Sequence, residues 1–410
     1  MIEGHDILCF APGPWGDIWR NRHQIMTRLA RANRVLYIEP WPHLRPTLRK
    51  LRDGQIRFAE LTGPRLEQVN ANLHVYRPAR WAPRADRFPL DRVAEAIQMG
   101  LLRRAIKGLH FCEPILWVFL PDMAVFTGRF GEKLVIYHMV DEYTGYSGVS
   151  ERWRPVMRHM EAQLARMADL VFVSSPTLLE SKRSLNEHML WVANAVDFDS
   201  FARAAVGRDA SPPDLANLPS PIIGYVGAIN EKVDLSLVVR VAQAFPAWSL
   251  VLVGPVRVSD PGNRVALEVL RGMPNVHFLG QKDVTLVPNY IAACDVCLLP
   301  YQMNEWTRHI DSLKLYEYLA CGKPVVATSV PAAQRFSDVV RVAASPTDFV
   351  AGVRDGLRGD HAELQAKRRS VAAQNTWERR IDVISAAIEE RLEVRSVARD
   401  AELRREREVG

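Results

Sequence analysis

The sequence lacks the features that would define a disulfide-stabilised or zinc-binding chain. Its 410 residues hold five cysteines, an odd number, all in apolar sequence surroundings. Cys294 and Cys297 have CxxC spacing, but no second such pair exists to complete a zinc site. This usage is typical of small buried hydrophobic residues in a reducing compartment, so we expect core cysteines and neither redox chemistry nor metal binding.

Long apolar runs are also missing. The most apolar stretch, residues 114–126, is interrupted by Pro121 and Asp122 and is too short to span a bilayer. The N-terminus shows no succession of basic, apolar and small residues typical of a secretion signal. We therefore expect a cytoplasmic protein, either soluble or bound peripherally at the inner face of the membrane.

What is present is an ordinary globular composition with an uneven charge. Apolar residues make up 48% and charged residues 24% of a chain long enough for two or three domains. Residues 15–110 carry 19 Lys and Arg against 8 Asp and Glu, within a net charge of +6. An acidic substrate or an anionic membrane surface suits this segment, and so does a solvated basic surface. No nucleic-acid-binding motif accompanies the charge, so we expect no nucleic acid as a partner.

Apolar runs alternate with helical patterns along the chain. Residues 6–10 and 35–38 read as buried strands around a helix at 19–31, which is a βαβ opening without the GxGxxG fingerprint. Residues 222–328 repeat the alternation, and the Pro- and Ser-rich residues 207–221 read as a linker. The pattern predicts an α/β chain with two Rossmann-like, doubly wound domains.

The stretch 309–328 reads as a helix start, a helix, a glycine stop and a buried strand. Asp311 or Ser312 can cap the helix, and Gly322 suits its end. The free N–H groups near Leu313 and Lys314, with the lysine charge, would face a phosphate, while Glu317 could accept hydrogen bonds from a ribose diol. An ordinary α/β helix with a solvated Lys and Glu fits the same spacing.

The letters SLKLYEYLACGKPVVAT resemble the donor-binding motif of family 4 glycosyltransferases of the GT-B fold, especially bacterial polysaccharide and teichuronic-acid-type members. The resemblance implies two Rossmann-like domains facing a cleft and a retaining reaction without a metal. It assigns residues 1–206 to an acceptor-binding domain, 207–221 to a linker, 222–376 to a nucleotide-sugar-binding domain, and 377–410 to a helix crossing back to the first domain with a charged tail.

The same resemblance assigns the donor site. Glu317 would hold the nucleotide ribose, and His309 stands where the family has a further glutamate. GYVGAINEKVDL is similar to the family's diphosphate-gripping loop, which adds Gly227 and Lys232, but Ala228 replaces its arginine, and we expect Lys314 to supply the missing charge. PNVHFLG resembles the base-binding segment. The implied donor site comprises Gly227, Lys232, Leu279, Gly280, His309, Ser312, Leu313, Lys314 and Glu317.

Acceptor and catalytic residues are expected at two places in the first domain. The first loop and helix start supply Asp17, Arg22 and His23, with Gln24 beside them, although a solvated polar loop fits equally. His138, Asp141 and Glu142 follow a buried strand, where open α/β sheets place ligands, and resemble a family segment; strand-end capping is the alternative. We expect His138 or Asp141 to orient or deprotonate the acceptor, Lys314 to aid departure of the diphosphate, and Glu142 to bind the acceptor.

Two further stretches carry separate expectations. Asp197 and Asp199 have the DxD form that binds a metal in another glycosyltransferase fold, but the family motif at the domain end explains them without one, and we expect no metal. Residues 39–92 are rich in Pro, Arg and Trp, which is typical of segments that lie on anionic lipid. We expect this region to form the acceptor or membrane face.

Together these residues predict a glycosyltransferase that moves a sugar from a UDP- or GDP-sugar substrate to a glycan or lipid-linked hydroxyl, with no cofactor. Two alternatives stay open: a non-catalytic partner subunit of the same fold, suggested by His309 and Ala228, and a nucleotide-sugar epimerase. A Rossmann oxidoreductase is disfavoured because the glycine fingerprint is missing.

Overall fold

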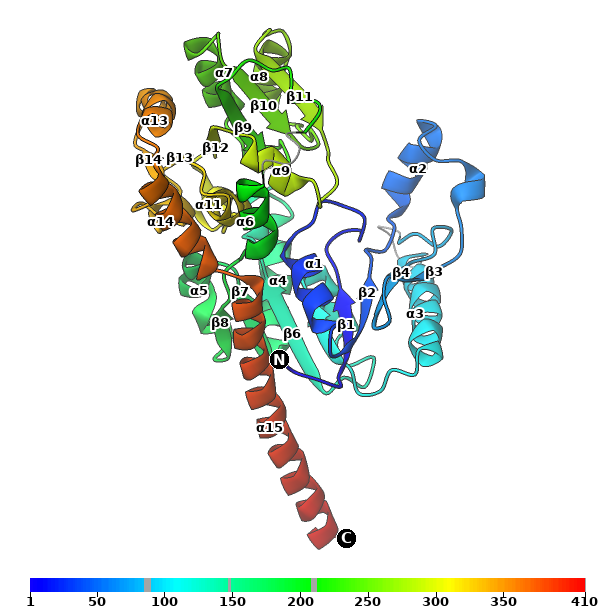
Figure 1. Ribbon diagram of the computed structural model, residues 1–410. Coiled ribbons are helices and arrows are strands. Elements are labelled where there is room, and N and C mark those ends of the chain that lie inside the picture. The colour runs from blue at the N-terminus through cyan, green and yellow to red at the C-terminus, as the bar shows by residue number, and fades with distance from the viewer. Residues whose placement is uncertain (85–89, 147–148, 208–211, 410) are drawn as a thin grey trace.

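The computed structural model describes residues 1–84, 90–146, 149–207 and 212–409. Two α/β domains lie one above the other, and a long helix runs from the second back along the first (Figure 1). Each domain is built on one predominantly or wholly parallel sheet with helices on its faces. The predicted pair of Rossmann-like domains is confirmed.

The first domain contains a sheet of eight strands in the order β3-β4-β2-β1-β5-β6-β7-β8. All neighbours are parallel except β3 and β4 at one edge. The strands are β1 (Asp6–Phe10), β2 (Arg34–Ile38), β3 (Arg65–Gln68), β4 (Leu73–Arg77), β5 (Ile115–Val118), β6 (Leu134–Met139), β7 (Leu170–Val173) and β8 (Met189–Trp191).

Helices cover both faces of this sheet because its central strands are apolar throughout. In β1, Ile7 and Cys9 face one apolar cluster and Leu8 and Phe10 face the other, as strand geometry requires. The helices are α1 (Asn21–Leu29), α2 (Leu44–Arg52), η1 (Phe58–Glu60), α3 (Leu90–Gly108), η2 (Pro121–Phe126), η3 (Tyr143–Gly145), α4 (Arg154–Met167), α5 (Pro176–Lys182) and η4 (Arg183–Leu185).

The second domain has a parallel six-stranded sheet in the order β11-β10-β9-β12-β13-β14. The strand order reverses between β9 and β12, which is where doubly wound folds bind ligands. The strands are β9 (Ile222–Val226), β10 (Ser249–Val253), β11 (Val276–Gly280), β12 (Val296–Leu299), β13 (Val325–Thr328) and β14 (Arg341–Ala343).

One large apolar cluster holds the second domain together. The helices of the second domain are α6 (Phe198–Val206), α7 (Leu235–Ala244), α8 (Pro261–Arg271), α9 (Val287–Ala292), α10 (Glu305–Arg308), α11 (Leu313–Ala320), α12 (Pro331–Gln334), α13 (Pro346–Arg358) and α14 (Ala362–Ala373). Cys294, Cys297 and Cys321 are buried here and Cys9 is buried in the first domain, as expected, whereas Cys112 is exposed.

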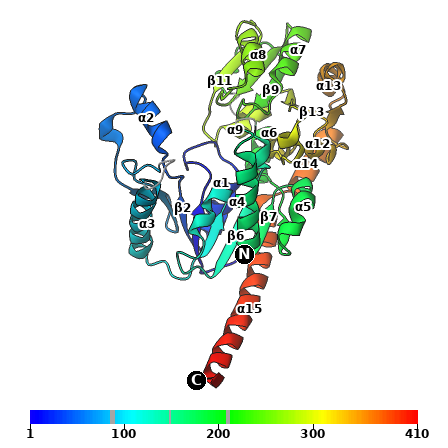
Figure 2. The same ribbon diagram turned by 180° about the vertical axis from the view of Figure 1, so that it is seen from behind.

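The domain boundaries differ from the predicted ones. Val196, Phe201 and Leu215 all pack in the core of the second domain, so the chain leaves the first domain about ten residues before position 206. It returns through α15 (Trp377–Val409), whose first turns lie on the first domain in both views (Figures 1 and 2). The α15 residues that pack in the core of the first domain are Trp377, Ile381, Ile384, Ala387 and Ile388.

The two chain segments that connect the domains lie side by side. The Val196 N–H donates to the Asn375 carbonyl at 3.0 Å, and the Trp377 N–H donates to the Val196 carbonyl at 3.3 Å. Val196 and Thr376 thereby form an isolated parallel bridge. Both passages between the domains are thus joined by backbone hydrogen bonds.

Within the described ranges, no helix combines the length and apolar character needed to cross a membrane.

Candidate active site

A cavity of about 670 Å³ lies between the two domains. Residues within two positions of the ends of strands from both sheets line it: Pro12 after β1, Asp141 after β6, Gly227 after β9, Gly254 after β10 and Tyr301 after β12. Parallel strands present their carboxyl ends at one edge of a sheet, so the two ligand-binding edges face each other across this space.

Helix α11 points its N-terminus at the cavity. Ser312 is its N-cap residue, yet the Ser312 side chain does not cap the helix, because its hydroxyl lies 3.0 Å from the Tyr301 hydroxyl. Within the described residues, the N–H groups of Leu313 and Lys314 have no hydrogen-bond acceptor. The positive end of the helix dipole is therefore open to an anion.

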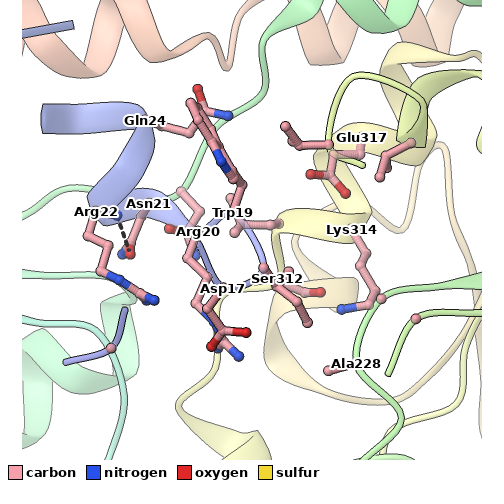
Figure 3. Close-up of a pocket in the computed structure, with 18 of the residues that line it drawn as sticks. Asp17, Trp19, Arg20, Asn21, Arg22, Gln24, Ala228, Ser312, Lys314 and Glu317 are labelled. Atoms are coloured by element: carbon pink, nitrogen blue, oxygen red, sulfur yellow. Dashed lines mark hydrogen bonds between the residues drawn. The ribbon is translucent and has the colours of Figure 1, made fainter. Parts of the chain in front are cut away.

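The Lys314 side chain reaches across the loop that follows β9. Its amine lies 5.4 Å from the centre of the Tyr225 ring. A Cβ on Gly227 would lie 2.0 Å from the Lys314 Cε, and Gly227 has φ +138°. Gly254 is equally constrained, because its Cβ would lie 2.2 Å from the Gly227 carbonyl oxygen. Gly227 thus makes room for Lys314, and Gly254 makes room for the backbone of the loop at Gly227. Figure 3 shows Lys314 extending toward Ala228.

Lys232 supplies a second cation from the same loop. Burial lowers the pKa of Lys232 to about 8, and the charges of Lys314 and Arg20 act in the same direction. The Lys232 amine lies 5.4 Å from the centre of the Tyr301 ring and 5.9 Å from that of Trp306. Burial alone would raise the pKa of Tyr301, but Lys232 and Lys314 outweigh it and lower that pKa. An anion entering the cavity would relieve this concentration of positive charge.

Glu317 lies one turn further along α11 and lines the cavity. Its carboxylate has no hydrogen-bond or ion-pair partner in the part of the chain that the structure describes. Burial raises the pKa of Glu317 to about 7, against the opposing charge of Lys314. The carboxylate is half-buried and has no partner among the described residues, so this group is suited to a ligand that donates hydrogen bonds.

The first domain forms the opposite wall through the loop after β1 and the start of α1 (Figure 3). Arg22 is buried and its Nε donates to the Tyr37 hydroxyl at 2.8 Å. Asp17 forms an ion pair of 2.7 Å with Arg257 of the second domain. Burial alone would raise the pKa of Asp17, but the Arg257 hydrogen bond outweighs it and lowers that pKa. Gln24 also lines the cavity.

Arg20 is a cavity residue that sequence reasoning missed. It caps the N-terminus of α1 and lines the cavity, where its charge acts on both Lys232 and Asp141. It has no ion-pair partner among the residues described. Its position after a strand end is a general signal for ligand binding, but its place opposite Lys232 depends on how the two domains meet.

Asp141 lies in the cavity, as predicted for the acceptor side. The Tyr146 hydroxyl donates to its carboxylate at 2.7 Å. Burial raises the pKa of Asp141, and the Tyr146 hydrogen bond and the Lys232 charge oppose that rise. The Tyr146 ring lies 4.6 Å from the Trp306 ring of α10, so Asp141 sits where the two domains touch.

Three of the predicted first-domain residues do not reach the cavity. His138 is buried among aromatic rings, 5.1 Å from Phe119 and 5.8 Å from Phe172, and burial lowers its pKa to about 3. His23 stacks on Trp19 at 5.5 Å, and burial lowers its pKa to about 3. Glu142 forms a 2.8 Å ion pair with Lys182. Core packing and an internal ion pair replace the expected catalytic and acceptor-binding contacts.

His309 also lies outside the cavity. Its Nε2 is 3.3 Å from a Glu305 carboxylate oxygen, and its carbonyl accepts a 2.7 Å hydrogen bond from Ser175 of the first domain. The neighbouring acid, Asp311, does line the cavity, but its carboxylate accepts from the Asn194 N–H at 2.6 Å and lies 3.2 Å from Arg335. His309 and Asp311 thus join the domains, and neither offers a free side chain to a donor.

The predicted base-binding residues border the cavity from β11. Leu279 and Gly280 are not lining residues, but the loop that follows them, residues 281–284, is. Gly280 is held in place because its carbonyl accepts from the Gly254 N–H at 2.8 Å. Ser312, Leu313, Lys314, Gly227 and Lys232 of the predicted donor set all line the cavity with Glu317.

Across the described residues, no cluster of three or more His, Cys, Asp and Glu side chains forms a metal site. Asp197 of the DxD sequence is the N-cap residue of α6, and its carboxylate accepts from the Ser200 hydroxyl at 2.9 Å. This part of the sequence begins a helix.

Comparisons with known proteins agree with this arrangement. A family model described as "Glycosyl transferases group 1" matches residues 220–358. A protein provisionally named the teichuronic acid biosynthesis glycosyltransferase TuaH, from Bacillus subtilis (strain 168), is 28% identical over 277 residues, which is 64% of this chain and 68% of TuaH.

Solved structures with the same architecture share little sequence. Sucrose-phosphate synthase from Thermosynechococcus elongatus superimposes with a TM-score of 0.68 at 17% identity, covering 94% of this chain and 99% of the other. HepE of Anabaena in complex with UDP-glucose gives 0.65 at 14% identity, covering 94% and 100%.

The fold is therefore the GT-B fold, and the chain is a glycosyltransferase of that class. Within the class, its second domain carries the glycosyl transferases group 1 region, which contains α11 and the loop after β9.

Proposed function

We propose that this protein transfers a sugar from a nucleotide-sugar donor, a UDP- or GDP-sugar, to a hydroxyl group of a glycan or glycolipid acceptor. The observation that carries the proposal is the convergence of three groups on the cavity: the open N-terminus of α11, the unpaired cations around it, and the free Glu317 carboxylate. HepE in complex with UDP-glucose supports a nucleotide sugar as the donor class.

The diphosphate would bind at the N–H groups of Leu313 and Lys314. Lys314 and Lys232 flank this position from the second domain, and Arg20 faces it from the first. Arg20 and Lys314 would together replace the arginine that the family resemblance places at Ala228. Fixed cations and N–H dipoles stabilise negative charge on a departing diphosphate without rearranging during the reaction. We infer that this site needs no metal for that purpose.

Glu317 would accept hydrogen bonds from the ribose hydroxyls, with the base against the loop 281–284. A ribose diol gives the half-buried carboxylate the hydrogen-bond donors that it lacks among the described residues. On the first-domain side, Asp141 and Arg22 would orient the acceptor hydroxyl. The name of TuaH supports a polysaccharide or glycolipid acceptor, and the family resemblance supports retention of configuration.

A panel of nucleotide sugars, screened by thermal shift and then by release of nucleotide, tests the proposal. We expect one donor to stabilise the protein by mass action. Glu317→Ala should weaken that binding by about tenfold through loss of the ribose contacts. Lys314→Ala should lower kcat by roughly a hundredfold, and affinity less, because its charge acts most on the leaving group. EDTA should leave turnover unchanged.

Lys367→Ala and Glu363→Ala on α14 are matched controls, since both side chains are exposed and neither lines the cavity. Unchanged kinetics in both site variants would overturn the assignment of the site. Donor binding with no turnover, tested with lysate-derived acceptors, would favour the second candidate, a non-catalytic partner subunit, which the position of His309 outside the cavity also supports.

A further inference from the structure

A segment of the first domain has no place in the core. Residues 43–70, which we name the basic protrusion, contain α2, η1 and β3, and none of them is buried. The chain leaves the sheet after β2 and returns to its edge at β3, and α2 stands off from the body of the domain in both views (Figures 1 and 2).

Helix α2 is amphipathic, although none of its residues is buried against the part of the chain that the structure describes. Leu44, Leu48 and Leu51 recur at helical spacing on one side of the helix. Its other residues include four basic and no acidic side chains: Arg45, Arg49, Lys50 and Arg52. A helix of this kind cannot gain stability from packing in the chain as described, so its sequence indicates an external apolar surface.

Large apolar side chains are exposed around the same protrusion. Phe58 of η1 is 80% exposed and Leu48 is 54% exposed. Trp81, at the base of the protrusion, is 49% exposed. Aromatic rings beside lysine and arginine suit the boundary between lipid head groups and acyl chains, where both kinds of group find partners.

We propose that the basic protrusion docks this glycosyltransferase onto an anionic lipid bilayer. The apolar side of α2, Phe58 and Trp81 would enter the interface, while the basic side chains would contact lipid phosphates. Charge complementarity favours anionic lipid over a protein partner, because residues 43–70 hold six Lys and Arg against three Asp and Glu. Asp53 at the end of α2 pairs with Arg49 and Arg52, but the helix itself has no acidic residue and its apolar residues form a narrow strip.

A second hollow lies beside the cavity, near the base of the protrusion. It measures about 630 Å³, contains Arg77 and Arg80 from the base of the protrusion, and shares Asp17 and Arg257 with the cavity. An acceptor held in the membrane could extend along this hollow toward Asp141. This extension rests on the proposed function, whereas membrane docking itself does not.

The test is co-sedimentation of the full-length protein with vesicles of phosphatidylcholine alone or mixed with phosphatidylglycerol. We expect binding only to the mixed vesicles, and we expect 1 M salt to abolish it, because the screening length falls to about 3 Å. Arg49→Glu combined with Lys50→Glu should lower partitioning at least tenfold, since each basic residue near such a surface contributes about fivefold. Phe58→Ala should weaken binding without changing its salt dependence.

The matched control is Arg264→Glu combined with Arg358→Glu, which reverses two exposed charges on α8 and α13 of the second domain. It should bind vesicles as the unmodified protein does. Equal binding to both vesicle types, no binding to either, or full binding by the protrusion variant would each overturn the proposal. Thermal shift with the donor reports separately on the cavity, so failure of docking and failure of the proposed function are distinguishable.

Discussion

Glu317 and Lys232 have pKa values that burial has moved toward each other from opposite sides. The pKa of Glu317 is raised to about 7 and that of Lys232 is lowered to about 8. Donor binding as proposed needs the first group ionised and the second protonated. Lowering the pH through 7 neutralises Glu317, and raising it through 8 neutralises Lys232, so both changes weaken binding.

We therefore predict that donor affinity is highest between pH 7 and 8. It should fall roughly tenfold at pH 6 and again at pH 9, one unit beyond each pKa. Calorimetric titration across this range is the measurement. Glu317→Gln should flatten the acid side only and Lys232→Arg the alkaline side only; a profile that both variants leave intact would contradict the assignment.

At the scale of residues, the sequence predicted the groups whose position depends on local structure. Lys314 and Glu317 lie on one short helix and Ser312 is its N-cap residue, so the geometry of that helix alone places them on the cavity. His138 was a different case. His138 lies in β6, where side chains alternate between the two faces of the sheet. Whether its side chain meets the cavity or the core depends on which helices cover that face.

Arg20 shows the converse. Its importance arises from the second domain, which brings Lys232 and α11 opposite to it, and no spacing within residues 15–24 encodes that juxtaposition. His309 likewise sits at the position that the family motif gives to a donor-binding acid, but the contact of its carbonyl with Ser175 makes it part of the junction between domains.

At the scale of elements, the strands were the most predictable feature, because a strand buried on both faces is an unbroken apolar run. The linker was less predictable from the sequence than the strands. Residues 207–221 look like a linker by composition, yet Leu215 packs in the second core, and Phe201 packs there before it. Whether a polar, proline-rich stretch contributes one anchoring side chain depends on the surface that it meets.

Helix α15 gives a prediction at this scale. Ile384 is fully buried against the first domain although it follows the whole second domain in sequence. Ile384→Ala should cost about 2–5 kcal/mol of unfolding free energy, since it removes apolar contacts and leaves a cavity. Urea denaturation followed by tryptophan fluorescence is the measurement.

The neighbouring Val383→Ala is the control, because Val383 is 47% exposed on the same helix and should change stability by less than about 0.5 kcal/mol. If both substitutions had equal effects, the helix would not be a structural part of the first domain.

At the scale of the whole molecule, a small set of contacts holds the cleft in its present shape. Asp17 and Arg257 form an ion pair across its mouth, and the Tyr146 ring meets the Trp306 ring further in. Gly145 allows that approach, because a Cβ there would lie 2.9 Å from the Trp306 backbone nitrogen.

The Asp17–Arg257 pair leads to the last prediction. Arg257→Gln should increase the radius of gyration of the donor-free protein in solution scattering, with a loss of stability below about 1 kcal/mol, because Arg257 is half exposed. Adding donor should restore the smaller value. Arg271→Gln breaks an ion pair within α8 and should leave the radius unchanged; identical scattering from the Arg257 variant would show that the pair does not control closure.

The bridge between Val196 and Thr376 limits how such a closure can occur. Two separate connections would let the domains twist, shear or tilt independently at each one. Here the connections are fastened to each other, so the domains share a single pivot at the back of the cleft. We therefore expect hinge rotation about this bridge, with Asn194 and Asp311 next to it moving less than Asp17 and Arg257, which pair across the two domains.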